Sequence, residues 1–411
     1  MEPVRKLSEQ LWRGEVSPDE RHPFHPLMVL EEIAPGVAFI SSFANVTAVD
    51  TAAGLLLVDV GGYLFGEMVF GALRGWSARE VALGIYTHGH IDHVFGIERF
   101  DEEASARSWP RPHVIAHRAL PARFDRYRKT GGYNGCINAR QFGAALAWPE
   151  RYRYPDETYD EARVLEVGGE RIELHHARGE TDDATWVWLP QRKLLCTGDL
   201  FIWATPNAGN PQKVQRYPGE WAQALRRMAG LGAEVLSPGH GVPIFGAARI
   251  GQALLETAAW LEHLEAGVLA RMNGGAKLDQ IVSEVTPPAE LAGRPYLQPI
   301  YDEPEFVVRN LWRLYGGWYD GDPAHLKPPP EAELAACISS LAGGAAKLVE
   351  RAEAAAQAGQ LALACQLVEW ARRAAPDDAA VRKARANIYA TRAEKERSLM
   401  ARGIFNAAAK D

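Results

Sequence analysis

The sequence predicts an α/β layered domain followed by an all-α helical domain, and two observations carry this prediction. In the N-terminal part, short apolar runs alternate with a helical pattern, and clusters of histidine and aspartate follow the ends of the runs. Residues 331–400, in contrast, are rich in alanine with almost no β-branched runs, so they parse into several helices. We therefore predict an α/β domain at residues 1–270 and a helical domain at residues 271–411.

Length and composition are those of a globular protein with more than one domain. A chain of 411 residues is too long for one ordinary core. Hydrophobic residues at 47% and charged residues at 24% exclude a disordered chain. A formal charge of −7 without a dense Lys/Arg stripe argues against a nucleic-acid partner.

The N-terminus and the cysteines predict a cytoplasmic location and no membrane partner. The first twenty residues are polar and lack the apolar core of a secretory signal. No apolar stretch reaches the ~18 residues that a membrane helix needs. The four cysteines are scattered without CxxC spacing, which is typical of reduced thiols and not of a disulfide framework.

The first strands lie in residues 36–60, where β-rich runs are broken by small and polar residues. We expect two hairpin-linked strands there, ending at Asp59. A helical pattern follows at 66–79, and VALGIYT (81–87) is expected to form a buried strand. Because ligands gather at the carboxyl ends of such strands, the histidines directly after residue 87 are expected to line a site.

The later elements continue the same alternation. We expect a strand at 113–117, hairpins at 163–177 and 185–200, a helix at 220–232, a strand entering a glycine-rich loop at 233–241, and a linker at 325–333. The first hairpin is expected to turn at Gly168-Gly169 and the second at Pro190-Gln191.

The stretch THGHIDHV (87–94) carries the chemistry of the N-terminal domain. In a strand-to-helix loop, neighbouring side chains can diverge enough to serve two metal ions. Three further candidates stand in glycine-containing turns beside apolar strands, in RGETDD, CTGDL and SPGHG. The candidate ligands are His88, His90, Asp92, His93, Glu180, Asp199 and His240.

THGHIDH, the Gly-Asp of TGD and the His of SPGH, in this order, resemble the metallo-β-lactamase superfamily of dinuclear metallohydrolases. The resemblance implies an αββα sandwich. It also implies a ligand assignment, in which His88, His90 and Glu180 hold the first metal, Asp92, His93 and His240 hold the second, and Asp199 bridges them. Asp92 and Asp199 are assigned catalytic roles as well. Asp59 stands where the superfamily has a buried aspartate that supports the loop.

Glu180 departs from the usual pattern, because most of the superfamily has histidine there. A carboxylate at this position is similar to the zinc-dependent alkyl sulfatases, although those usually have Glu where this chain has Asp199. Three carboxylates and a bridging hydroxide would neutralise two divalent cations, so we expect a sulfate ester to need dedicated donors elsewhere. Imidazole and carboxylate ligands without cysteine favour two zinc ions per chain, with iron or manganese left open by ligand type.

The C-terminal part resembles the same enzymes independently. LWRLYGGWYDGDPAHLKPPP (311–330) and the helices after it are similar to the alkyl sulfatase dimerisation domain, which implies a homodimer through these helices. A peptide-binding helical repeat is the alternative. Many of these sulfatases append a sterol-carrier-like domain, which we do not expect in this chain, and we therefore expect smaller or more polar esters.

Two segments supply candidate donors for an anionic substrate. Residues 202–218 follow Asp199 and residues 123–143 follow the histidine cluster. The candidates are Asn207, Lys213 and Arg216, followed by Tyr133, Asn134 and Arg140, each of which is as well explained as a surface or turn residue. One of His175 and His176 is expected to orient a ligand.

The sequence therefore predicts a hydrolase of a small-molecule ester, with an alkyl sulfate as the substrate that the resemblance implies and a metal-bound hydroxide as the attacking group. A lactone, carboxylic ester, amide or phosphodiester is the alternative on the same scaffold. A non-catalytic, metal-stabilised assembly protein is the alternative from another class. Cleavage at carbon or at sulfur is left open.

Overall fold

The computed structural model describes residues 4–411, which form two compact units. The first unit contains residues up to Gly131, Trp148–Ala276 and Gln280–Gly317. The second contains Gly132–Ala147, Lys277–Asp279 and Trp318–Asp411. The domain boundary at residue 270 that the sequence indicates stays a prediction.

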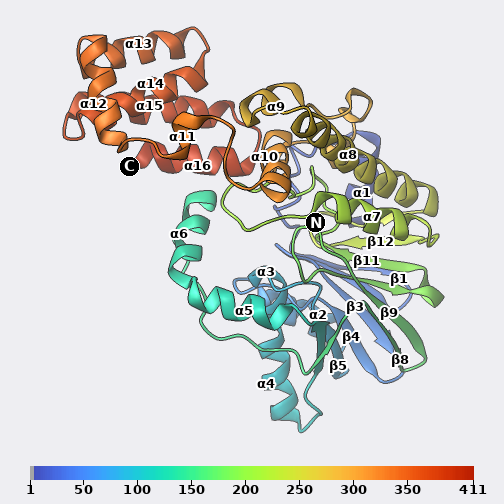
Figure 1. Cartoon of the computed structure of the whole chain (residues 1–411). Helices are drawn as coiled ribbons and strands as arrows, with labels where there is room; N and C mark the ends of the chain where they lie inside the picture. Colours follow the sequence, from blue (N-terminus) through green and yellow to red (C-terminus); the bar gives the residue numbers. More distant parts are fainter. Residues whose placement is uncertain (1–3) are drawn as a thin grey trace. The chain divides into compact units, whose positions relative to one another are not determined.

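The first unit is built on two sheets (Figure 1). The first sheet has the order β1-β2-β3-β4-β5-β6-β7, antiparallel from β1 to β4 and parallel from β4 to β7. Its strands are β1 (Val29–Ala34), β2 (Val37–Ser41), β3 (Val46–Thr51), β4 (Gly54–Val58), β5 (Val81–Ile85), β6 (His113–His117) and β7 (Glu157–Tyr159).

The second sheet has the order β13-β12-β11-β10-β9-β8 and is antiparallel except between β11 and β12. Its strands are β8 (Ala162–Val167), β9 (Glu170–His176), β10 (Thr185–Leu189), β11 (Leu194–Gly198), β12 (Val235–Pro238) and β13 (Ile244–Phe245). Gly168 and Gly169, both with positive φ, turn the β8–β9 hairpin.

Helices pack against the two sheets and against one another. They are α1 (Val4–Arg13), α2 (Gly66–Trp76), α3 (Ile91–Val94), α4 (Ile97–Arg107), α5 (Leu120–Lys129), α7 (Pro218–Ala229), α8 (Ala247–Asn273), most of α9 (Leu278–Glu284) and α10 (Pro304–Gly316). Short 3₁₀ turns occupy η1 (Pro190–Arg192), η2 (Ala289–Leu291) and η3 (Pro295–Leu297).

Successive side chains of the first sheet's strands point to opposite faces, so the sheet contributes to two hydrophobic clusters. Phe39 and Leu56 belong to the large cluster that also holds the buried residues of the second sheet, α7 and α8. Their neighbours Ile40 and Leu57 face a separate cluster with α2, α4 and α5. Figure 1 shows these helices beside the sheets, which gives the predicted αββα layering.

The second unit is helical, as predicted. Most of α6 (Gly131–Phe142) joins α11 (Pro323–Leu326), α12 (Glu331–Ala342), α13 (Ala345–Gln357), α14 (Leu361–Ala374), α15 (Ala379–Lys395) and α16 (Leu399–Lys410) in this unit. Small residues such as Ala352, Ala364 and Ala384 fill its core and let the helices approach closely. Helix ends fall near Gly359, which has positive φ, and at Asp378, whose side chain caps α15.

Within residues 4–411, no single helix is long and apolar enough to cross a bilayer. Helices α12 and α13, which meet at a bend of 83°, have together the length and apolar composition of one membrane span.

One predicted segment differs in detail. Residues 36–60 contain three strands instead of two, because the chain reverses a second time at residues 51–54. There the Thr51 hydroxyl donates to the Gly54 carbonyl oxygen at 2.8 Å. Thr-Ala-Ala-Gly is a weaker turn signal than Asn-Gly or Asp-Gly, which explains why the sequence pattern missed it. The strand at 113–117 and both later hairpins are confirmed.

Candidate metal centre

The loop that carries the histidines is fixed by two buried aspartates. It leaves β5 at Ile85 and enters α3 at Ile91. Asp59 accepts hydrogen bonds from the Thr87 backbone N–H and from the Thr87 hydroxyl, both at 2.8 Å. Asp183, which is fully buried, accepts one from the Gly89 N–H at 3.0 Å. The loop is therefore held from both sides before any ligand binds.

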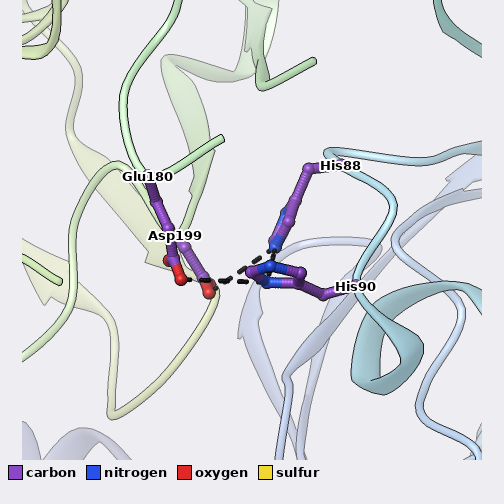
Figure 2. A group of neighbouring side chains, drawn as sticks. All are labelled: His88, His90, Glu180 and Asp199. Atoms are coloured by element: carbon purple, nitrogen blue, oxygen red, sulfur yellow. Dashed lines mark hydrogen bonds and ion pairs between the residues drawn. The ribbon is translucent and has the colours of Figure 1, made fainter. Parts of the chain in front are cut away.

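The first group of candidate ligands contains His88, His90, Glu180 and Asp199, whose ligand atoms all lie within 4.8 Å of one another. Figure 2 shows the two histidines facing the two carboxylates. His88 Nε2 lies 3.7 Å from Asp199 Oδ2, and His90 Nδ1 lies 3.8 Å from Glu180 Oε1. The histidines follow β5, Glu180 precedes β10, and Asp199 follows β11.

The second group contains Asp92, His93 and His240 within the same limit. Asp92 Oδ2 lies 3.6 Å from His93 Nε2 and 3.4 Å from His240 Nε2. Asp199 also reaches this group, since its two oxygens lie 3.4 Å from His93 Nε2 and 3.4 Å from His240 Nε2. The two groups therefore share Asp199.

Glycine before His240 permits this closeness. A Cβ at Gly239 would lie 2.1 Å from Asp199 Oδ1, so the loop after β12 can approach Asp199 only without a side chain there. The Gly239 N–H in turn donates to the Gly198 carbonyl oxygen at 2.9 Å. The TGD and SPGH turns are thus joined through their glycines.

The remaining ring nitrogens are occupied by partners that orient the histidines. His93 Nδ1 lies 2.7 Å from Asp59 Oδ2, His88 Nδ1 lies 3.0 Å from the Thr87 hydroxyl, and His240 Nδ1 contacts the Phe43 carbonyl oxygen. In all three histidines Nε2 is the atom that faces the carboxylates of the two groups. Such partners are what metal-bound imidazoles ordinarily have.

Two buried atoms test whether the residues fit a divalent cation. His93 Nε2 and Asp199 Oδ1 are buried, and among the described residues neither has a hydrogen-bond partner. Buried polar atoms without a partner are rare because they cost free energy. A cation between imidazole nitrogens and carboxylate oxygens would satisfy both, and this donor set suits zinc. The residues present therefore fit a divalent cation such as zinc.

The electrostatics agree with this. Burial alone would lower the pKa of His240, but the Asp199 carboxylate raises it to about 9. Burial likewise opposes ionisation of His93, yet the charges of Asp199 and Asp59 raise its pKa well above the usual value. The carboxylates of the two groups thus favour positive charge at His93 and His240. Bound cations would supply positive charge at this place.

Glu180 has partners of its own. Its pKa is raised to about 8 by burial, against the charge of Arg216. Asn207 Nδ2 donates to Glu180 Oε1, and Arg216 Nη2 lies 3.3 Å from the same oxygen. Arg216 Nη1 also donates to the Glu180 carbonyl oxygen. The donors that the sequence assigns to substrate at positions 207 and 216 therefore face Glu180 here.

The other predicted donors are placed differently. Lys213 is half-buried, and burial together with Arg216 lowers its pKa to about 8 against the charges of Asp92 and Glu180. Tyr133, Asn134 and Arg140 lie on α6 in the second compact unit. Their role in substrate binding stays a prediction.

Sequence reasoning missed the buried ion pair behind the histidine loop. Arg123 Nε lies 2.9 Å from Asp183 Oδ1, and both side chains are almost fully buried. The two aspartates after Glu180 in RGETDD were an available signal. His175 and His176 make other contacts, since His175 stacks on Trp186 and His176 stacks on His117.

An aromatic group beside His240 was missed as well. The Phe24 ring centroid lies 4.3 Å from that of His240 and 4.0 Å from that of Tyr301. Phe43 meets His240 edge-on at 5.5 Å. The sequence HPFHP (22–26) shows aromatic side chains but does not indicate that they contact His240.

Two family models match the chain. Residues 41–240 match the metallo-beta-lactamase superfamily, and residues 277–411 match alkyl sulfatase dimerisation. A linear primary-alkylsulfatase of a Pseudomonas strain is 27% identical over 361 residues, which cover 82% of this chain and 68% of the relative. An (R)-specific secondary-alkylsulfatase of Pseudomonas is 24% identical over 358 residues, covering 79% of this chain and 53% of the relative.

Solved structures show the same fold. The stereoselective inverting sec-alkylsulfatase Pisa1 of Pseudomonas is similar with a TM-score of 0.83 at 22% identity. The similarity covers 93% of this chain and 65% of that one. The chain thus spans between half and about two thirds of the length of these relatives.

Proposed function

We propose that this chain, which joins a metallo-beta-lactamase superfamily domain to an alkyl sulfatase dimerisation domain, hydrolyses an alkyl sulfate or a related small ester at a centre of two zinc ions. Alkylsulfatase relatives and the fold support a metal-dependent hydrolase. The observation that carries the proposal is the shared Asp199, within 3.7 Å of nitrogens from both ligand groups.

Seven residues would hold the two cations. The first ion would be held by His88, His90 and Glu180, the second by Asp92, His93 and His240, and Asp199 would be shared. Two divalent cations held there would supply a bound water of lowered pKa and would polarise the substrate oxygens.

The chain's own residues prepare this chemistry. Asp59 accepts from His93 Nδ1 and so leaves Nε2 directed at the site. Five of the seven candidate ligands are buried, which lowers the local dielectric constant and strengthens the electrostatic interaction with an anionic ester. Lys213 is the cation that we assign to the sulfate group, since it lies in the field of Asp92 and Glu180 and carries a charge near neutral pH.

The helices of residues 277–411 would form a homodimer, as the name of the matched family indicates. The cytoplasmic location expected from the sequence stays a prediction. A lactone, carboxylic ester, amide or phosphodiester is the alternative substrate class on the same centre. An assembly protein without activity is the less favoured reading, because all seven candidate ligands are brought together.

The test measures metal and product on the full chain. Elemental analysis of protein expressed with zinc is expected to give about two zinc ions per chain. Ion chromatography should then detect inorganic sulfate released from short and medium alkyl sulfates. Asp92→Ala should abolish release, whereas Asp125→Ala, at a side chain 56% exposed on α5, should not.

Each outcome tests a different part of the proposal, namely the metal centre, the substrate or the residues assigned to the centre. A zinc content near zero would contradict the metal centre. Zinc at two per chain without sulfate release from any alkyl sulfate would contradict the substrate and favour the alternative esters. Release that persists in Asp92→Ala would contradict the assignment of the centre to these residues.

A further inference from the structure

Glu180 is the candidate ligand with the most unusual surroundings. It is 4% exposed and shares its group with a second carboxylate, Asp199. Arg216, only 1% exposed, lies beside it with Nη2 3.3 Å from Oε1. The same guanidinium donates through Nη1 to the Glu180 carbonyl oxygen. One arginine thus holds both the side chain and the backbone of this residue.

Glu180 and Arg216 need each other whenever Glu180 is ionised, as it would be beside a bound cation, because both are then charged groups removed from water. A buried guanidinium without a carboxylate, or the reverse, is strongly destabilising. Glu180 is the carboxylate that the structure places in ion-pair distance of Arg216. The Arg216 Nε atom is buried and has no hydrogen-bond partner among the described residues, so no second carboxylate is hydrogen-bonded there.

The segment that carries Arg216 is itself held in place. Asn310 on α10 accepts from the Arg216 N–H at 3.3 Å and donates to the Arg216 carbonyl oxygen at 3.1 Å. Asp302, fully buried, accepts from the backbone N–H groups of Gly209 and Asn210 at 2.5 and 3.2 Å. Arg216 is therefore fixed at its backbone and directed at Glu180.

Asn207 completes the arrangement from the same segment. Its Nδ2 donates to Glu180 Oε1, the oxygen that also faces Arg216. Its position follows from the Asp302 contacts on either side, since the Thr205 hydroxyl donates to the Asp302 carbonyl oxygen at 2.6 Å. Two donors on one carboxylate oxygen fix its orientation more firmly than either alone.

We propose that Arg216 is the charge-compensating and positioning residue of Glu180, with Asn207 as its second support. This rests on the proposed function, because it assumes that Glu180 binds a cation. Two divalent cations and three carboxylates have a summed charge of +1, and Arg216 raises this sum to +2. That is the charge that a neutral histidine at position 180 would give without the arginine. The centre thereby keeps its attraction for an anionic ester.

A double-mutant cycle tests the proposal, using Glu180→His, Arg216→Met and the double variant of the full chain. Zinc affinity is measured by competition with a chromophoric chelator, and the Tm is measured on metal-free protein. Glu180→His alone leaves Arg216 buried beside an imidazole, so zinc binding at the first site should weaken at least about 10-fold. In the Arg216→Met background the same change should weaken binding less than about 3-fold.

Two controls separate charge from packing. Arg216→Lys keeps the charge but not the fork geometry, so it should retain most of the Tm that Arg216→Met loses. Arg226 and Glu262 form a surface ion pair at 2.5 Å with side chains 46% and 39% exposed. Glu262→His and Arg226→Met should give additive effects and unchanged zinc binding.

If Glu180→His weakens zinc binding equally in both backgrounds, the proposal is overturned, and Arg216 is then a candidate for substrate binding. If wild-type protein binds no zinc, the proposed function fails, yet coupling in the metal-free Tm still supports the Glu180–Arg216 pair. Should Glu180→His not accumulate as folded protein, Glu180→Gln replaces it in the cycle, because it removes the charge at nearly unchanged volume.

Discussion

Asp59→Asn is the change that probes the second cation site most cleanly. Asp59 is 2% exposed and has a left-handed backbone with φ of 55°. Asparagine tolerates this conformation and has nearly the same size, so the fold should survive. What changes is chemistry, because Oδ2 accepts from both His93 Nδ1 and the Thr87 hydroxyl, at 2.7 and 2.8 Å. An NH₂ group at that place would accept from neither.

The magnitude follows from the role of the lost acceptor. Without it, the proton of His93 is free to move from Nδ1 to Nε2, the atom that faces Asp92 and Asp199. Removing such an orienting partner costs about 10- to 100-fold in metal affinity, or about 1.4 to 2.7 kcal/mol. The larger loss should fall on the second site, because Asp59 contacts His93 directly, whereas it reaches His88 of the first site through the Thr87 hydroxyl.

Stepwise zinc titration against a chromophoric chelator resolves the two sites. Asp160→Asn is the matched control, since Asp160 is 55% exposed and pairs with Arg118 on the surface. Its zinc affinities should equal those of the wild type. Equal affinities for Asp59→Asn at both sites would refute the reasoning, because the 2.7 Å contact would then not orient the ligand.

Three further results are expected. A Cβ at Gly96 would lie 1.7 Å from the Val60 carbonyl oxygen. Gly96→Ala should therefore cost about 3 kcal/mol or more in stability and lower the Tm. The control Gly71→Ala, in open space on α2, should leave the Tm unchanged. Burial and the stacked His176 lower the pKa of His117 to about 4, so stability is fully present above pH 6.5 and is lost by up to about 3 kcal/mol as the pH falls to 4. Tm measured across this pH window should fall less steeply in His117→Gln, and a slope equal to that of the wild type would contradict the assignment. Light scattering should give twice the chain mass of 45.2 kDa, and deletion of residues 331–411 should give a monomer; a full chain at 45.2 kDa would contradict the dimer.

The candidate ligands could be predicted because their signals are local. Each stands at a strand end, and strands of one sheet bring their ends to a common edge. The HxHxDH spacing fixed four of them within six residues, and the turns TGD and SPGH marked Asp199 and His240. The structure brings these residues into two groups that share Asp199, and their assignment as metal ligands stays a prediction.

Partners far apart in sequence could not be predicted in this way. Asn207 and Arg216 follow Glu180 by 27 and 36 residues, and the sequence shows only that they are donors. Helix α6 is a second example, since it follows α5 directly but packs in the unit of the C-terminal helices. A Cβ at Gly403 would lie 2.0 Å from the Gln141 carbonyl oxygen. Such contacts depend on tertiary packing and leave no periodic signal.

The charge of the centre illustrates why this matters for function. Counting ligands alone makes Glu180 lower the affinity for anions, and this was the expectation from the sequence. The structure pairs that carboxylate with a buried arginine, so the added negative charge is cancelled within the protein. Lys213, half-buried and in the field of Asp92 and Glu180, then adds a further positive charge at the centre. A carboxylate ligand is in this way compatible with an anionic sulfate ester, provided that Arg216 stays ion-paired to Glu180.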